Sequence, residues 1–127
     1  TDGRLVHDGE SIIAFLDKRP LFPGHVLVVP RMHVATIDDV DVPLLNALFH
    51  DVRTISRAVE RATGSQGTFI ALNNKVSQSV PHVHVHVVPR SKGDGLRGFF
   101  WPRNGYRDET HADEVQAAIR QALQAGE

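Results

Sequence analysis

Hydrophobic residues follow two periods along this chain, and these periods separate predicted strands from predicted helices. Short apolar or alternating runs predict strands at residues 4–7, 11–16, 25–30, 68–72 and 81–89. Apolar residues at steps of three and four predict a long helix over 41–63 and a second helix over 111–125. Because several strands precede the first helix, the order indicates an α+β domain with a mostly antiparallel sheet of about five strands.

The predicted helix over 41–63 has one apolar stripe and recognisable ends. Asp41 is a suitable N-cap, with Pro43 in the first turn, and Gly64 is a suitable C-terminal stop. The opposite face is charged, and we expect His50 on that face to be a surface residue. The stripe consists of Leu45, Leu48, Val52, Ile55, Val59 and Ala62, with Leu44 and Phe49 at its margins.

The last predicted strand contains three of the chain's eight histidines. Successive side chains of a strand point to opposite faces, and two residues advance about 6.8 Å. His82, His84 and His86 therefore share one face of the predicted strand. The valines between them share the other face, which we expect to belong to the core.

The pattern alone leaves three interpretations of these histidines open. They could be solvated residues on an exposed sheet face. They could bind a metal, because His-x-His on a strand suits zinc, with His25, His33 or Asp17 as a further ligand. They could also act as a nucleophile or an acid–base group, because imidazole has an unperturbed pKa of about 6.5 and is largely neutral at pH 7.

Composition narrows the class of protein. The 127 residues are a usual length for one domain, and 14 Lys or Arg against 15 Asp or Glu argue against a nucleic-acid coat or a membrane-surface binder. The absence of cysteine excludes disulfides, thiolate zinc sites and cysteine nucleophiles. Because the chain shows no apolar run of membrane-spanning length and no signal-peptide pattern, we expect a cytoplasmic protein.

Several blocks of the sequence resemble the histidine triad (HIT) family of nucleotide hydrolases and transferases. HVHVHVV matches the family's His-φ-His-φ-His-φ-φ signature, within QSVPHVHVHVVPR at 78–90. PGHVLVVPRMH at 23–33 and FLDKRP at 15–20 resemble the two preceding family blocks, in the family's order. The resemblance implies a HIT-like fold, a single HIT domain over 1–127 and a homodimer.

The resemblance also implies the catalytic roles. His84, the middle histidine, would attack the α-phosphorus of a nucleotide and form a covalent nucleotidyl-histidine that water then hydrolyses. His86 would contact the phosphate, and Ser79 would contact the phosphate or the leaving group. His82 and His25 correspond to the two supporting histidines of the family, which orient their neighbours.

Three further residues are expected to bind the substrate. Asp17 resembles the residue that hydrogen-bonds the ribose hydroxyls, although its position before Lys18 also suits a turn residue. Asn73 would replace the family's amide donor to the phosphates, but the shortened loop leaves the match with Asn74 open. Gln78 precedes the serine as it does in relatives.

A covalent histidine mechanism implies no required cofactor and no metal in the active site, although Mg²⁺ can accompany a polyphosphate substrate. Many bacterial relatives have a structural zinc held by two cysteines and two histidines. His33 and His82 match those histidines, but the chain has no cysteine. Either the zinc has been lost, or its other ligands lie upstream of Thr1.

The segment 90–107 combines five Lys or Arg residues and one Asp with aromatic residues. These residues could hold phosphates and stack bases, or they could pack onto the sheet and face water. With the VPR ending of the last strand, they favour dinucleoside polyphosphates as substrates. The alternatives are a nucleoside phosphoramidate hydrolase and a nucleotide-binding protein with vestigial turnover. We expect adenosine phosphates as ligands and neither a membrane nor a nucleic acid as a partner.

Overall fold

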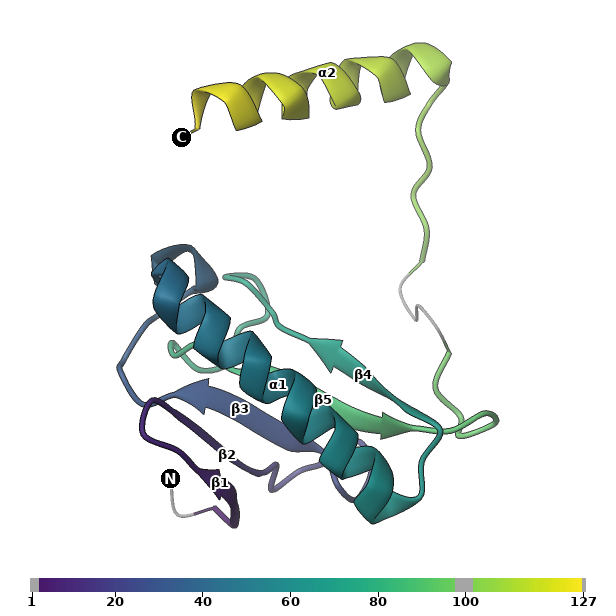
Figure 1. Cartoon of the computed structure of the whole chain (residues 1–127). Helices are drawn as coiled ribbons and strands as arrows, with labels where there is room; N and C mark the ends of the chain where they lie inside the picture. The colour runs from purple at the N-terminus through teal and green to yellow at the C-terminus, as the bar shows by residue number, and fades with distance from the viewer. Residues whose placement is uncertain (1–2, 98–101, 127) are drawn as a thin grey trace. The chain divides into compact units, whose positions relative to one another are not determined.

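The structure is a computed structural model that describes residues 3–97 and 102–126 (Figure 1). The chain divides into two compact units, Thr1–Asp94 and Gly95–Glu127. Within the described residues, neither helix has the length and apolar character needed to cross a membrane. A single HIT domain over 1–127 stays a prediction.

The first unit contains one five-stranded antiparallel sheet with the order β1-β2-β3-β5-β4. This arrangement confirms the predicted α+β class. A single turn of 3-10 helix, η1 (Ile37–Asp39), follows the third strand. The strands are β1 (Leu5–Asp8), β2 (Ile12–Leu16), β3 (Val26–Pro30), β4 (Gly67–Ala71) and β5 (Val85–Arg90).

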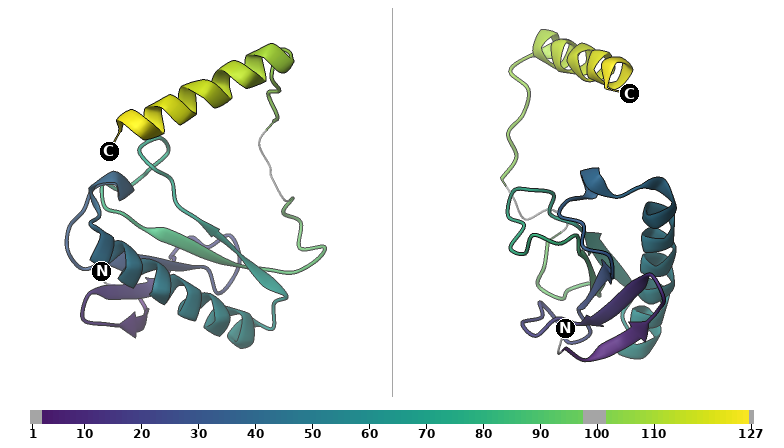
Figure 2. Two further views of the ribbon diagram at one scale, coloured as in Figure 1. Left: turned by 45° about the horizontal axis from the view of Figure 1, so that its top comes forward. Right: turned by 90° about the vertical axis from the view of Figure 1, so that its left-hand side faces the viewer.

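Helix α1 (Val42–Thr63) packs against one face of this sheet, as Figure 2 shows in its right-hand view. Its ends are those predicted: the Asp41 carboxylate accepts a hydrogen bond from the Leu44 N–H at 2.9 Å, and Gly64 adopts a left-handed φ of 70°. The sequence therefore specifies both boundaries of the long helix.

The buried stripe of α1 is narrower than predicted. Leu48, Val52, Ile55 and Val59 are buried, but Phe49 is 40% exposed and Ala62 is exposed. Phe49 lies one residue past the core-facing Leu48, and Ala62 lies in the last turn of α1. His50 is exposed, as predicted.

The histidine strand is shorter than predicted, because β5 begins at Val85. The hydrogen-bonded ladder between β5 and β3 ends at Val85 for two reasons. The Val83 N–H donates to the Val34 carbonyl instead of to β3, and Pro30 has no N–H to donate to the histidine strand. The alternation nevertheless continues, since Val83, Val85 and Val87 are at most 2% exposed and the three histidines are half-buried. The valine face is therefore core, as predicted.

The second unit contains helix α2 (Glu109–Ala125), which begins two residues earlier than predicted. Asp108 caps it by accepting a hydrogen bond from the His111 N–H at 2.8 Å. Of the aromatic residues expected to stack or pack in segment 90–107, Phe99, Phe100 and Trp101 lie outside the described residues. Tyr106 is 64% exposed, and its ring centroid lies 5.7 Å from that of His111 in α2.

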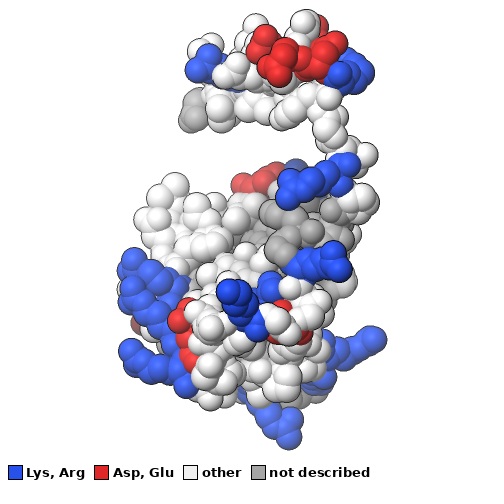
Figure 3. Space-filling model, turned by 90° about the vertical axis from the view of Figure 1, so that its right-hand side faces the viewer, with Lys and Arg blue, Asp and Glu red and all other residues white. Residues whose placement is uncertain are grey.

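Charges are balanced over the whole chain, and one close ion pair lies at the start of segment 90–107. Arg90, at the start of segment 90–107, donates from Nε to Asp94 at 2.6 Å and from Nη2 at 3.1 Å. On the face drawn in Figure 3, basic and acidic side chains are interspersed with neutral ones. The basic character of the segment therefore rests on Lys92, Arg97, Arg103 and Arg107.

Candidate active site

A pocket of about 660 Å³ contains the histidine triad. The triad alternates with core valines, so the pocket lies on the sheet face opposite the core and α1. It is lined by His82, His84 and His86, with Asp17, Ser79, Val80 and Arg31, and by apolar residues of β2 and β3: Ile13, Phe15, Leu27, Val29 and Pro30. The volume is that of a small-molecule site.

The strand register gives this pocket two ends. Val26 of β3 pairs with Val87, and the Asp17 N–H donates to the His25 carbonyl, so His86, His25 and Asp17 lie together. At the other end the ring of His82 reaches the carbonyl of Pro30 at 2.8 Å. We call these the Asp17 end and the Ser79 end. His84 lies between them.

The proton of His84 is assigned by the backbone. Its Nδ1 lies 2.8 Å from the carbonyl oxygen of His82, and a carbonyl can only accept. Nδ1 therefore carries the hydrogen, and in the neutral ring Nε2 carries the lone pair. A neutral imidazole held in this tautomer can act as a nucleophile through Nε2.

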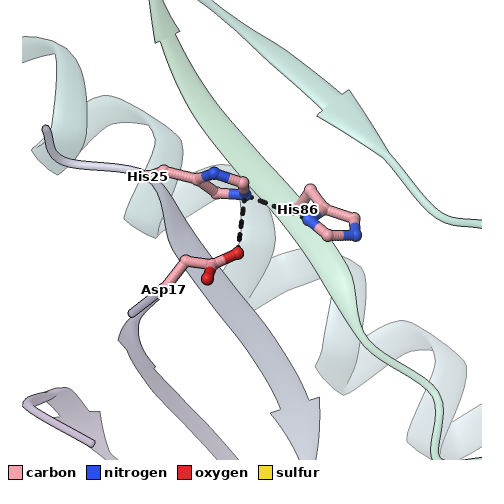
Figure 4. Close-up of side chains that lie close together, drawn as sticks. All are labelled: Asp17, His25 and His86. Atoms are coloured by element: carbon pink, nitrogen blue, oxygen red, sulfur yellow. Dashed lines mark hydrogen bonds and ion pairs between the residues drawn. The ribbon is translucent and has the colours of Figure 1, made fainter. Parts of the chain in front are cut away.

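A second chain of hydrogen bonds assigns the protons of His25 and His86 (Figure 4). The Leu21 N–H donates to Nδ1 of His25 at 3.1 Å, so the neutral ring of His25 has its hydrogen on Nε2. Nε2 lies 3.0 Å from Nδ1 of His86 and donates to it. Nε2 of His86 therefore carries a hydrogen and can donate to an anion.

Both histidines are kept neutral by their surroundings. Burial lowers the pKa of His25, against an opposing effect of Asp17. Burial also lowers the pKa of His86, with further lowering by the neighbouring His25 and His84 and an opposing effect of Asp17. Neutrality is what the hydrogen-bonded chain requires, because each ring must both donate and accept.

Asp17, His25 and His86 offer ligand atoms within 4.8 Å of one another, which is a geometry that could hold a metal ion. The hydrogen bonds oppose this interpretation. The single lone pair of neutral His25 already accepts from Leu21, so Nε2 would have to lose its hydrogen to bind a metal. The chain of donors fits an anion-binding site better than a metal site.

Asp17 is a turn residue that also lines the pocket. Its Oδ1 accepts from the Arg19 N–H at 2.9 Å, which is a turn contact. Its Oδ2 lies 3.6 Å from Nε2 of His25, and the residue lines the pocket. The turn contact is therefore present, and the ribose contact stays a prediction.

Asn73 and Gln78 lie outside the pocket lining among the described residues. The Gln78 amide donates to the carbonyls of Ala35 and Val80, and its oxygen accepts from the Lys75 N–H at 3.0 Å. Gln78 therefore braces the loop that carries Ser79. Asn74 donates to Asp38 at 3.3 Å. Asn73 is exposed, and its phosphate contact stays a prediction.

The short loop at residues 73–78, before Ser79, contains no glycine. Lys75 and Ser77 have φ values of 73° and 62°, in the left-handed region. The Gln78 bonds and an ion pair of 2.6 Å between Lys75 and Asp38 hold this conformation. The turn before Ser79 is therefore made by Lys75 and Ser77 in the conformation that glycine usually supplies.

His33 and His82 lie together, with their Nδ1 atoms 3.2 Å apart. The Pro30 carbonyl accepts from Nε2 of His82, so Nδ1 of His82 accepts and His33 donates. Among the described residues, no third potential ligand joins these two histidines. Both alternatives for the family's structural zinc, its loss or further ligands upstream of Thr1, stay predictions.

Sequence reasoning missed Arg31 and the apolar part of the pocket. In the predicted strand at 25–30, Leu27 and Val29 line the pocket. A signal was available, because residues 27 and 29 alternate with the core residues Val26 and Val28. Arg31 gave no comparable signal, since its place depends on the β1–β2 turn.

Comparisons with known proteins identify relatives of this chain. A bis(5'-nucleosyl)-tetraphosphatase (asymmetrical) of Schizosaccharomyces pombe is 39% identical over 83 residues, 64% of this chain and 46% of the relative. Adenylylsulfatase HINT3 of Arabidopsis thaliana is 31% identical over 125 residues, 93% of this chain and 61% of the relative. The chain thus spans about half to three-fifths of the length of these two relatives.

A solved structure shares the fold of this chain. The crystal structure of a HIT family member from Bacillus subtilis superposes with a TM-score of 0.82 at 29% identity, covering 95% of this chain and 88% of that chain. A family model described as HIT domain matches residues 1–93, which include the pocket. The chain belongs to the HIT family.

Proposed function

We propose that this protein is a nucleotide hydrolase or nucleotidyl transferase that acts at the α-phosphorus of its substrate through His84. The observation that carries the proposal is the tautomer of His84, whose Nδ1–H is held by the His82 carbonyl. The lone pair on Nε2 is therefore available for attack on an electrophile bound in the pocket.

In the first step, Nε2 of His84 forms a bond to the α-phosphorus and the bond to the leaving group breaks. The electron pair of that bond leaves with the leaving group. The ring becomes a cation that keeps its hydrogen on Nδ1, and the His82 carbonyl at 2.8 Å stabilises this charge. A polyphosphate departs as an anion and needs no proton.

In the second step, water attacks the phosphorus and the bond to Nε2 breaks. One proton passes to solvent, the nucleoside monophosphate is released, and His84 returns to its neutral form. A different nucleophile in place of water would make the same intermediate a nucleotidyl donor. No step requires a metal ion or another cofactor.

The neighbouring groups bind the charge that the reaction concentrates on the phosphate. His86 donates from Nε2 because His25 supplies the hydrogen bond to its Nδ1. The Ser79 hydroxyl donates at the other end of the pocket. Asp17 accepts from the ribose hydroxyls, and the apolar surface of Phe15 and Leu27 packs against the base.

Dinucleoside polyphosphates are the substrates that we propose. The name of the S. pombe relative supports this class for that protein, whereas the A. thaliana relative is named for an adenylyl sulfate. Both names describe cleavage of an anhydride at a nucleotide. The homodimer and the cytoplasmic location stay predictions.

The test is replacement of His84 by alanine together with identification of the adduct. His84→Ala should lose turnover by at least about 1,000-fold, because the nucleophile is absent. It should keep its fold, since the alternating core face is valine. Mass spectrometry of wild type quenched under denaturing alkaline conditions, which preserve the acid-sensitive phosphorus–nitrogen bond, should find the nucleotidyl group on His84. An adduct on His82 or His86 would overturn the assignment.

The substrate is tested with a panel of diadenosine polyphosphates, adenylyl sulfate and adenosine phosphoramidate, each followed by product identification. The proposal expects AMP as one product of every substrate that is cleaved and the highest kcat/KM for a diadenosine polyphosphate. A higher value for the phosphoramidate would contradict the proposed class while leaving the role of His84 intact.

A further inference from the structure

Arg31 is a basic residue in the lining of the pocket that contains the triad. It follows directly after β3, and its backbone N–H donates to the Ser11 carbonyl at 2.8 Å. This bond places the residue beside the first turn of the sheet. A guanidinium in the lining of a proposed phosphate site is a candidate group for binding phosphate oxygens.

Arg31 lies at the Ser79 end of the pocket. It is next to Pro30, whose carbonyl accepts from His82, and it is far along β3 from Val26, which pairs opposite Val87. The ribose contact proposed for Asp17 is at the other end. A nucleotide with its ribose at Asp17 and its α-phosphorus at His84 therefore directs its leaving group towards Ser79 and Arg31.

The guanidinium of Arg31 is held in place on one side. Its Nε donates to the Gly9 carbonyl at 2.8 Å, and its Nη2 donates to the Asp8 carboxylate. Among the described residues, Nη1 makes no hydrogen bond. The side chain is about half exposed, so solvent and a ligand can reach the remaining donors.

We propose that Arg31 binds the phosphate groups beyond the α-phosphate and so selects substrates with an anionic leaving group. The inference rests on the proposed function, because it takes the α-phosphorus to lie at His84. Arginine suits this role, since its planar fork of N–H donors matches phosphate oxygens. The Asp8 and Gly9 contacts orient the fork before the substrate arrives.

The test measures equilibrium binding, so that it does not depend on turnover. AMP and α,β-methylene ATP are titrated into the wild type and into Arg31→Met, which removes the charge but keeps the length. Arg57→Met is the matched control, because Arg57 is exposed on α1, which covers the other sheet face. Asp8→Asn removes the ion pair but keeps the arginine.

The wild type should bind α,β-methylene ATP more tightly than AMP. Arg31→Met should weaken the analogue by about tenfold or more, the usual effect of a lost hydrogen bond to a charged group, and should change AMP little. Arg57→Met should change neither, and Asp8→Asn should keep the preference for the analogue.

Three results would overturn the inference. If Arg31→Met weakened the binding of AMP and of α,β-methylene ATP equally, Arg31 would only shape the pocket and would not select the distal phosphates. No weakening would make it only the partner of Asp8. Loss of the preference in a variant with Arg97→Ala and Arg103→Ala, but not in Arg31→Met, would assign the contact to the other unit. A wild type that binds neither ligand would instead contradict the proposed function itself.

Discussion

Two triad histidines, His86 and His82, each lie against a histidine from outside the triad. The two pairs have similar geometry, but they differ in what fixes the ring proton of the triad member. The rings of His25 and His86 have centroids 5.2 Å apart, and so do the rings of His33 and His82. In the first pair, the only ring hydrogen bond of His86 among the described residues comes from His25. In the second pair, the Pro30 carbonyl fixes His82 independently of His33.

The difference shows when a second histidine is needed. A backbone carbonyl sets the tautomer of a ring without help, as it does for His82 and His84. Among the described residues, no carbonyl bonds to the ring of His86. Neutral His25, whose tautomer is fixed by the Leu21 N–H, sets the tautomer of His86 instead. We therefore expect His25 to matter for catalysis and His33 to matter little.

The largest expected effect compares His25→Ala with His33→Ala. Without His25, the ring of His86 can place its hydrogen on Nδ1, and then Nε2 no longer donates to the phosphate. We expect kcat to fall by about 100-fold. We expect His33→Ala to retain kcat within a few-fold, because the Pro30 carbonyl still fixes His82. Steady-state kinetics on one substrate measures both.

His25 is buried, so its replacement needs a control for folding. Circular dichroism and the affinity for AMP serve this purpose. An unfolded variant would lose both. A folded variant with the wrong tautomer keeps the native spectrum and loses more in kcat than in AMP affinity, because the His86 hydrogen bond strengthens in the transition state. Equal effects of the two alanine variants on kcat would contradict the comparison.

The next effect concerns Asp17, which lies beside the first pair. Asp17→Ala should weaken the binding of ribonucleotides by about tenfold more than the binding of their 2′-deoxy analogues, because a carboxylate accepts from the 2′ hydroxyl. Asp17→Asn keeps the oxygen that accepts from the Arg19 N–H, so it separates the turn from the ribose contact. Equal losses for ribose and deoxyribose in both variants would reduce Asp17 to a turn residue.

Much of this site could be predicted from the sequence, because it depends on local patterns. The alternation of Val83, Val85 and Val87 with the histidines assigned the two faces of the strand. The resemblance to the HIT family placed His25 and Asp17 at the site, and the structure brings both to His86. The caps of α1 were predicted from Asp41 and Gly64 for the same local reason.

The rest depends on contacts between distant parts of the chain. The proton of His82 is fixed by Pro30, and Arg31 is oriented by Asp8 and Gly9. Neither contact has a periodic signal, since each forms only when the sheet register is complete. The end of the ladder before Val85 could not be predicted either, because it requires the Val83 N–H to find Val34.

The smallest expected effect is a loss of stability in acid that comes from the first histidine pair. Burial lowers the pKa of both His25 and His86 in the folded protein, whereas an unfolded histidine titrates near 6.5. As the pH falls below about 6.5, the unfolded chain takes up these protons before the folded chain does. The two histidines therefore contribute their full share of the free energy of unfolding above about pH 6.5. That contribution decreases as the pH falls from there to the lowered pKa values of the folded protein.

His25→Ala sharpens this prediction. The variant lacks one group with a lowered pKa, and the pKa of His86 is no longer lowered by a neighbouring His25. The free energy of unfolding should then change less between pH 7.5 and pH 5 than in the wild type, although the variant is less stable at pH 7.5. Urea unfolding at four or five pH values measures the slope. A slope equal to that of the wild type would mean that the pair is not held neutral by the fold, and the chain from Leu21 to His86 would then need another explanation.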